Sequence, residues 1–222
     1  MNRLILVRHG GSTGNEDPSF YGYNDSALCL TTNGIRQALN TGTMLAGVEP
    51  RWAKPGNFAL EVFVSQYSRA QQTARVVLDQ MSLLSIQPRV RPLLNEREYG
   101  VTYDPRMDTD PNFDGSGSES AAEARNRVTG LMEEFESLLG RADVLAFSHY
   151  GTIRALIANL TDLDDEAMMQ IDVPNGGAFL FLRTFDEDGQ SVFTAQPLPD
   201  HVLEKTASLI SQPPAAPPPT AV

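Results

Sequence analysis

Leu4-Ile-Leu-Val-Arg-His-Gly-Gly-Ser-Thr-Gly-Asn15 is the stretch of sequence that indicates the fold of this chain. Its four apolar residues, 4–7, are typical of a strand that is buried on both faces of a parallel sheet. Arg8 and His9 follow directly, so we expect them at the carboxyl end of this strand, where open α/β sheets bind their ligands. The glycines behind them bring backbone N–H groups close to an anion, because no Cβ intervenes. A cation, an imidazole and bare amides together suit a phosphoryl group.

A glycine-rich turn after a strand also occurs in two kinds of nucleotide-binding site. The spacing of Gly10, Gly11 and Gly14 does not fit Gly-x-Gly-x-x-Gly, and no Gly-Lys-Ser/Thr follows. Neither a Rossmann site nor a P-loop is therefore expected. Without support from the rest of the sequence, a tight turn with an incidental histidine would be the better interpretation.

Two later strand ends carry polar residues of the same kind. Residues 60–64 predict a second strand, and Arg69 follows it at the start of a predicted helix. Residues 143–147 predict a further core strand, and His149 follows it. Of the three histidines in the chain, His9 and His149 thus both come directly after predicted core strands. A single histidine is more often structural, but the pair favours a functional site.

Two helices between these strands have clear start signals. The first begins at Thr31 or Thr32, either of which would serve as the N-cap. The residues predicted to form its apolar face are Ile35, Ala38, Leu39, Gly42 and Leu45. The second begins at the capping box Ser-x-x-Glu formed by Ser120 and Glu123. We expect both helices to cover the sheet.

Two polar loops are predicted near the site. Residues 16–30 mix Asp, Pro, Gly and Asn with Phe20, Tyr21 and Tyr23. These aromatic side chains either contact the substrate or pack within the loop, and the sequence leaves both alternatives open. Residues 101–118 hold four aspartates against one arginine, Arg106.

The residues at the strand ends resemble the motifs of the histidine phosphatase superfamily, which includes cofactor-dependent phosphoglycerate mutases and acid phosphatases. The first stretch is similar to the family's Arg-His-Gly signature, with Gly11 where Glu is usual. Residues 65–74 resemble Ser-Pro-x-x-Arg-Ala-x-Gln-Thr-Ala, with Gln66 for Pro. Residues 148–154 resemble Ser-His-Gly-Gly-Thr-Ile-Arg, with Tyr150 for the first Gly. The resemblance covers roughly residues 4–185.

The resemblance implies an α/β fold and a phosphate pocket. The implied fold is a three-layer α/β/α sandwich with a mostly parallel, mixed central sheet, of the phosphoglycerate mutase-like type. In the implied site His9 is the nucleophile, and the phosphate is bound by Arg8, Asn15, Arg69 and His149. His149 also counts among the catalytic residues. No metal ion or other cofactor is required, because the arginines neutralise the phosphate.

Three glutamates are candidates for the group that protonates the leaving oxygen. The family has Leu-x-Glu after its third strand, and residues 94–100 resemble the mutase version, which makes Glu96 the candidate general acid. Glu98 is the rival and would be solvated or paired with an arginine. Glu119 ranks lower, because the helix dipole stabilises a carboxylate in a first turn without any catalytic role. Burial would raise the pKa of Glu96 and the arginines would lower it, and the sequence does not decide between them.

These features predict a phosphomonoester hydrolase that acts through a phosphohistidine on a small phosphorylated metabolite. A mutase shares the first half of this reaction, but it must hold a second anionic group with basic residues. The acidic loop at 101–118 favours hydrolysis and a substrate with few further negative charges. A third alternative is a phosphate-binding protein that no longer turns over. It would follow if Tyr150 were strained by a positive φ.

The composition limits the remaining classes. With 222 residues, of which 41% are hydrophobic, the chain can bury one sizeable core, so we expect one domain over residues 1–207. The proline-rich residues 208–222 predict a disordered tail. The net charge of −11 disfavours nucleic acid and anionic membranes as partners. The oligomeric state is not predicted.

The expected location is the cytoplasm. A single cysteine, Cys29, excludes an intramolecular disulfide and suits a reducing compartment. The start of the sequence lacks a signal-peptide pattern, and no apolar run reaches the roughly 18 residues of a membrane span.

Overall fold

The computed structural model describes residues 3–21, 25–48, 52, 59–100, 103–113, 115, 117–196 and 198. The predicted domain end at residue 207 and the predicted tail lie outside these ranges. None of the helices in the described part combines the length and apolar character that are needed to cross a bilayer.

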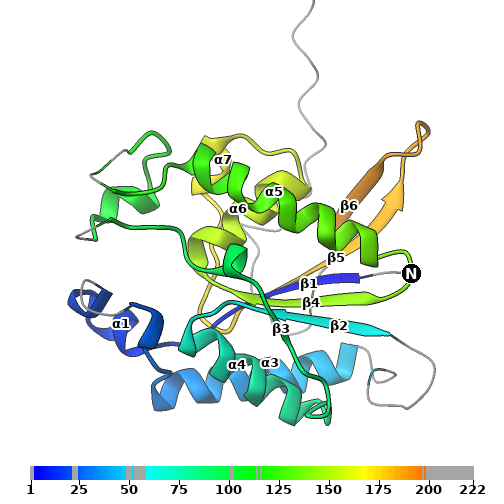
Figure 1. Ribbon diagram of the computed structural model, residues 1–222, viewed down its shortest axis with the longest axis horizontal. Helices are drawn as coiled ribbons and strands as arrows, with labels where there is room; N and C mark the ends of the chain where they lie inside the picture. Colours follow the sequence, from blue (N-terminus) through cyan, green and yellow to red (C-terminus); the bar gives the residue numbers. More distant parts are fainter. Residues whose placement is uncertain are drawn as a thin grey trace, which may run out of the picture.

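A mixed, mostly parallel sheet forms the centre of the molecule (Figure 1). Its six strands within the described residues lie in the order β3-β2-β4-β1-β5-β6. They are β1 (Arg3–Arg8), β2 (Leu60–Val64), β3 (Arg89–Val90), β4 (Asp143–Ser148), β5 (Ala178–Phe185) and β6 (Ser191–Gln196). The strands β1 to β4 run parallel, whereas β5 pairs antiparallel with β1 and with β6. This confirms the predicted sheet.

Helices cover both faces of the sheet (Figure 1). One layer contains α3 (Thr32–Val48) and α4 (Ser68–Gln80), and the other contains α5 (Ala121–Leu138), α6 (Tyr150–Leu160) and α7 (Asp165–Met169). Side chains alternate along β1, as they do in any strand. Leu4 and Leu6 therefore join the apolar cluster under α5 and α6, while Ile5 and Val7 join the cluster under α3 and α4. The predicted three-layer sandwich and the burial of β1 on both faces are confirmed.

The register of the parallel strands brings the predicted site residues to one edge. Arg8 pairs with Ser148, and the backbone N–H of His9 donates to the carbonyl of Ser148 at 3.0 Å. On the other side of β4, the N–H of Ser65 donates to the carbonyl of Phe147 at 3.1 Å. The segments that follow β1, β2 and β4 therefore begin side by side at the same edge of the sheet.

The predicted apolar face of α3 is partly wrong. Ile35 and Leu39 are 44% and 40% exposed. The predicted Ala38, Gly42 and Leu45 are buried, and Gly34 and Thr41 are buried in place of Ile35 and Leu39. Small residues face inward because the helix backbone lies directly against the loop after β1, where a Cβ on Gly34 would overlap the carbonyl of Gly11.

The segments between the main elements contain short helices. These are α1 (Thr13–Glu16), η1 (Pro18–Phe20), η2 (Asp25–Ala27), η4 (Pro92–Leu94) and η5 (Pro105–Asp108). Two of them occur in the predicted loop at 16–30, and η5 occurs in the acidic loop. Both loops are thereby held close to the edge at which the central strands end.

Candidate active site

His9 is buried at the end of β1, and its two hydrogen bonds define its tautomer. Nδ1 lies 2.7 Å from the carbonyl oxygen of Gly10, and Nε2 lies 3.2 Å from Nε of Arg69. A guanidinium only donates, so Nε2 must carry a lone pair and Nδ1 the proton. Burial, together with the charges of Arg69 and Arg8, lowers the pKa of His9 well below its usual value. The ring is therefore neutral, with its bare nitrogen next to Arg69.

His149 lies beside His9, with the ring centroids 5.0 Å apart. Its Nε2 is 2.8 Å from Oγ of Ser65, which itself donates to Oδ1 of Asn95 at 3.0 Å. Because that hydroxyl proton is already used, Nε2 of His149 is the donor and Nδ1 is bare. Nδ1 is buried and has no partner within the described ranges. Burial, followed by the charge of Arg69, lowers the pKa of His149 well below its usual value.

The two arginines differ in how fully they are paired. Arg69 is buried, and its Nη1 donates to both the backbone carbonyl and Oδ1 of Asp25 at 2.7 Å. Nη1 of Arg8 donates to the carbonyl of Val173 at 2.5 Å. Nε of Arg8 is buried and has no partner in the part of the chain that the structure describes. A buried, unpaired N–H is costly, and an oxyanion beside it would remove that cost.

Glu96 is buried against the first turn of α6. Its Oε1 accepts hydrogen bonds from the backbone N–H groups of Arg97 (2.8 Å), Gly151 (2.9 Å) and Thr152 (3.3 Å). Burial raises the pKa of Glu96 and outweighs the N–H of Arg97 and the two nearby guanidinium groups, which lower it. This answers the question that the sequence left open. A protonated Glu96 can accept at Oε1 and hold its proton on Oε2.

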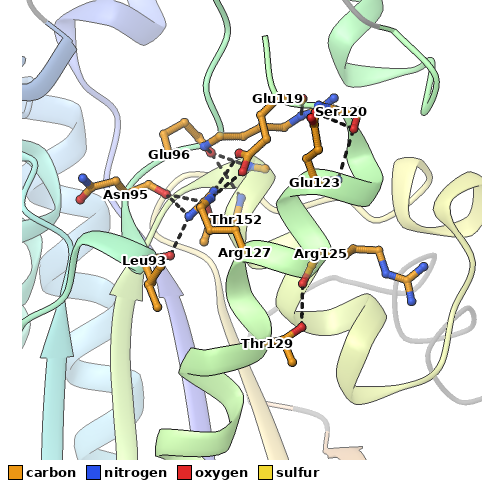
Figure 2. A network of polar contacts seen from close by, with 12 residues as sticks. Leu93, Asn95, Glu96, Glu119, Ser120, Glu123, Arg125, Arg127, Thr129 and Thr152 are labelled. Carbon is orange, nitrogen blue, oxygen red and sulfur yellow. Dashed lines mark hydrogen bonds and ion pairs between the residues drawn. The ribbon is translucent and has the colours of Figure 1, made fainter. Parts of the chain in front are cut away.

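A polar network fixes the segment that carries this glutamate (Figure 2). Arg127 of α5 pairs with both carboxylate oxygens of Glu119 at 2.7 and 3.0 Å. It also donates to the carbonyls of Leu93 (2.8 Å) and Asn95 (3.5 Å) and to Oγ1 of Thr152 (3.2 Å). Thr152 in turn donates to the carbonyl of Asn95 at 2.6 Å. The carboxylate of Glu119 is therefore occupied by a structural ion pair, and the rival Glu98 is exposed.

A cavity of about 220 Å³ opens beside these residues. Of the predicted site residues, it is lined by Arg8, His9, Asn15 and Glu96. Arg69 and His149 are buried directly behind His9. The side chain of Asn15 is partly used within the loop, since Oδ1 accepts from Ser12 and Nδ2 donates to the hydroxyl of Tyr21. Within the described ranges, no group of three or more His, Cys, Asp or Glu side chains could hold a metal ion.

Tyr150 is not strained by a positive φ. Among the described residues other than glycine, positive φ occurs at Ser82 and Asp162. Tyr150 instead begins α6, with His149 as its N-cap, and its ring lies 4.8 Å from Cζ of Arg8. The main argument for a protein that has lost turnover is thereby removed.

Sequence reasoning missed several residues of the site. Tyr99, Tyr103 and Asp108 line the cavity, and Asp25 pairs with Arg69. Of the aromatic residues noted at 16–30, Tyr21 lines the cavity, Phe20 is 45% exposed, and Tyr23 lies outside the described residues. The acidic character of the 101–118 loop was the one signal that pointed to Asp108.

Known proteins resemble the chain over most of its length. It is 31% identical over 193 residues to the adenosylcobalamin/alpha-ribazole phosphatase of Escherichia coli (strain K12), covering 78% of this chain and 86% of that protein. It is 26% identical over 224 residues to 2,3-bisphosphoglycerate-dependent phosphoglycerate mutase 2 of Lactobacillus johnsonii, covering 84% and 93%. Among solved structures, a mycobacterial glucosyl-3-phosphoglycerate phosphatase matches with a TM-score of 0.69 at 22% identity, covering 89% and 98%, which shows a shared fold.

The family assignment rests on a match that spans the whole sheet. The family model of the histidine phosphatase superfamily (branch 1) matches residues 4–194. This range runs from β1 into β6 and includes the two facing histidines, both arginines and the buried glutamate. The chain belongs to the histidine phosphatase superfamily.

Proposed function

We propose that this protein is a phosphomonoester hydrolase that forms a phosphohistidine on His9 and acts on a small phosphorylated metabolite. The observation that carries the proposal is that a bare imidazole nitrogen and a buried carboxyl group lie at one cavity. His9 presents a bare Nε2, and Glu96, which lines the same cavity, has a raised pKa. A nucleophile and a proton donor for the leaving oxygen are the two groups that phosphoryl transfer to a side chain requires.

In the first step Nε2 of His9 forms a bond to phosphorus as the bond to the leaving oxygen breaks. Glu96 gives its proton to that oxygen, and the alcohol departs. The Nδ1–H of His9 stays on the carbonyl of Gly10, so the ring keeps its orientation. In the second step water attacks the phosphohistidine, Glu96 takes its proton, and phosphate and free His9 are regenerated.

The proposed phosphate site uses Arg8, Arg69, His149 and Asn15 around the non-bridging oxygens. Nε of Arg8 is already an unpaired buried donor. Arg69 would transfer its Nε hydrogen bond from His9 to the phosphate, which frees Nε2 for attack. Each charge-assisted hydrogen bond of this kind contributes about 1.5–3 kcal/mol. Because these cations neutralise the phosphate, the proposed reaction needs no metal ion.

The charges around the cavity favour hydrolysis over mutase chemistry. A mutase must hold the second phosphate of a bisphosphate. Among the described residues that line the cavity, Arg8 is the one arginine or lysine, and Asp108 contributes a negative charge. Arg106 of the neighbouring loop is paired with Asp104 at 2.7 Å. A second phosphate would therefore face a carboxylate rather than a cation.

The test measures hydrolysis of para-nitrophenyl phosphate with and without EDTA, using the parent protein, His9→Ala and the control Asp110→Asn. Asp110 is an exposed residue of the acidic loop that does not line the cavity. We expect turnover that is insensitive to EDTA, lost in His9→Ala and kept in Asp110→Asn. Quenching in alkaline SDS should trap an acid-labile, base-stable phosphoenzyme in the parent protein and in Asp110→Asn, but not in His9→Ala. Rapid conversion of 3-phosphoglycerate to its 2-isomer with a bisphosphate primer would overturn the choice of hydrolysis.

A further inference from the structure

Aromatic side chains that the proposed chemistry does not use line the same cavity. They are Tyr21, Tyr99, Tyr103 and Tyr150. Three of them form a continuous cluster, because the ring centroids of Tyr99 and Tyr103 are 5.4 Å apart and those of Tyr21 and Tyr103 are 6.4 Å apart. Aromatic faces attract cations. Within the protein, Cζ of Arg8 already lies 4.8 Å from the ring centroid of Tyr150.

Asp108 adds a negative charge beside these rings. It lines the cavity, and its Oδ2 accepts a hydrogen bond from the hydroxyl of Tyr103 at 2.5 Å. Arg154 donates to the backbone carbonyl of Asp108 at 2.9 Å and not to its carboxylate. Among the described residues, no arginine or lysine forms an ion pair with Asp108. Its carboxylate is therefore not part of an ion pair.

The cavity thus carries opposite charges in two parts. Arg8 supplies the positive charge next to His9 and Tyr150, and Asp108 supplies the negative charge next to Tyr103. Burial raises the pKa of Tyr99 and of Tyr103, so both phenols are uncharged at neutral pH. A second anion on the substrate would be repelled by Asp108, and a neutral alcohol would give that carboxylate no ion-pair partner.

We propose that the substrate is a zwitterionic phosphomonoester, in which the alcohol carries a protonated or quaternary ammonium group. With the phosphate at His9, the ammonium group would contact the tyrosine rings and Asp108. This inference rests on the function proposed above and names its substrate class. The volume of about 220 Å³ is below the range typical of drug-sized ligands, so the alcohol is a small amino alcohol.

The test compares two esters of the same shape that differ by one positive charge: phosphocholine and 3,3-dimethylbutyl phosphate. Their dissociation constants are measured by calorimetry on His9→Ala, which cannot turn them over, so differences in leaving-group reactivity do not enter. The same pair is measured on His9→Ala combined with Asp108→Asn, and with Asp110→Asn as the matched control. Phosphoethanolamine serves as the member with a primary ammonium group, and 3-phosphoglycerate as the member with a second anionic group.

We expect phosphocholine to bind about tenfold more tightly than its neutral isostere, and 3-phosphoglycerate to bind more weakly than both. Asp108→Asn should reduce the preference to about threefold or less, and Asp110→Asn should keep it. Raising the salt concentration from about 0.02 M to about 0.5 M should also reduce the preference for phosphocholine, because salt screens the charge of Asp108. This test needs no substitution in the loop. Equal affinities, or no detectable binding of any ester, would overturn the inference. Turnover of para-nitrophenyl phosphate by the parent protein separates that result from failure of the proposed function.

Discussion

At the scale of single residues, the site is defined by where its protons lie. His9 keeps a proton on Nδ1 through Gly10, and His149 keeps one on Nε2 through Ser65. Both bare nitrogens lie among buried cations, and the carboxyl of Glu96 has a raised pKa. The free protein therefore offers two bare imidazole nitrogens to an anion, and the raised pKa of Glu96 favours its role as the proposed proton donor.

Oxyanion binding should be accompanied by proton uptake. In the free protein the pKa of His149 is well below 6.5, so Nδ1 is bare at neutral pH. A phosphate or vanadate dianion beside it would favour imidazolium and raise that pKa. At about pH 8, calorimetry in two buffers of different ionisation enthalpy should show uptake of close to one proton. His149→Asn should bind more weakly and without uptake, and identical heats in both buffers for the parent protein would contradict this role.

Replacing Glu96 by Gln should separate its role as an acid from its role in the structure. Gln keeps an oxygen for the three backbone N–H groups but has no proton to give. We expect kcat/KM to fall about 10²–10⁴-fold for an alkyl phosphate and far less for para-nitrophenyl phosphate, whose leaving group needs no proton. Because kcat/KM reports the first phosphoryl transfer, the later attack of water does not enter. Equal losses on both esters would argue against general acid catalysis.

At the scale of elements, helix starts and loop clamps hold the reacting groups. The first turn of α6 binds Glu96, and α5 clamps the adjoining segment through Arg127. The space is tight, since a Cβ on Gly151 would lie 2.9 Å from Cβ of Arg97 and 3.1 Å from Oε1 of Glu96. A shift of either helix would therefore move the proposed acid.

Arg127→Met should lower both stability and acid catalysis. It removes the donor for two carbonyls and leaves Glu119 without its partner, so the free energy of unfolding should fall by about 1–3 kcal/mol. The ratio of kcat/KM for para-nitrophenyl phosphate to that for an alkyl phosphate should rise, because Glu96 is less well placed. Arg125→Met is the matched control, since Arg125 also lies on α5 but pairs with Asp165. Arg125→Met should lose stability without a change in the ratio of the two kcat/KM values. If the ratio rose equally in both variants, the effect would belong to α5 as a whole and not to Arg127.

The sheet and the position of the site could be predicted from the sequence, but some contacts between elements could not. The uninterrupted apolar run of β1 and the polar residues after each strand predicted the sheet and the grouping of His9, Arg69 and His149 at one edge. The inward face of α3 could not be predicted, because it depends on a backbone contact between Gly34 and Gly11 from another element. The direction of the Glu96 pKa shift and the pairing of Asp25 with Arg69 likewise depend on residues that meet in space.

At the scale of the whole molecule, the site makes stability depend on pH. His9 and His149 have lowered pKa values in the folded protein, so the unfolded chain binds more protons as the pH falls below 6.5. Each contributes stability that is fully present above that value and is lost as the pH falls through the folded pKa. Glu96 has the opposite sign, because its raised pKa gives stability below 4.5 that is lost as the pH rises through its folded pKa.

The free energy of unfolding should therefore decline on acidification below about pH 6.5, by about 1.4 kcal/mol for each unit of pKa difference at each histidine. Urea titrations between about pH 5 and pH 8 measure this slope. His149→Gln should give a shallower slope than the parent protein. An unchanged slope would show that the buried imidazoles do not set the acid sensitivity.

The position of β1 in the sheet has a consequence for biosynthesis. This strand is made before the other strands that the structure describes, yet both of its neighbours come late, since β4 begins at Asp143 and β5 ends at Phe185. While the nascent chain is shorter than this, a strand that is buried on both faces in the folded protein has two open edges and no partner. Such long-range pairing slows folding and exposes a segment that self-associates readily. The proposed active site therefore cannot form until synthesis has passed β4 and β5.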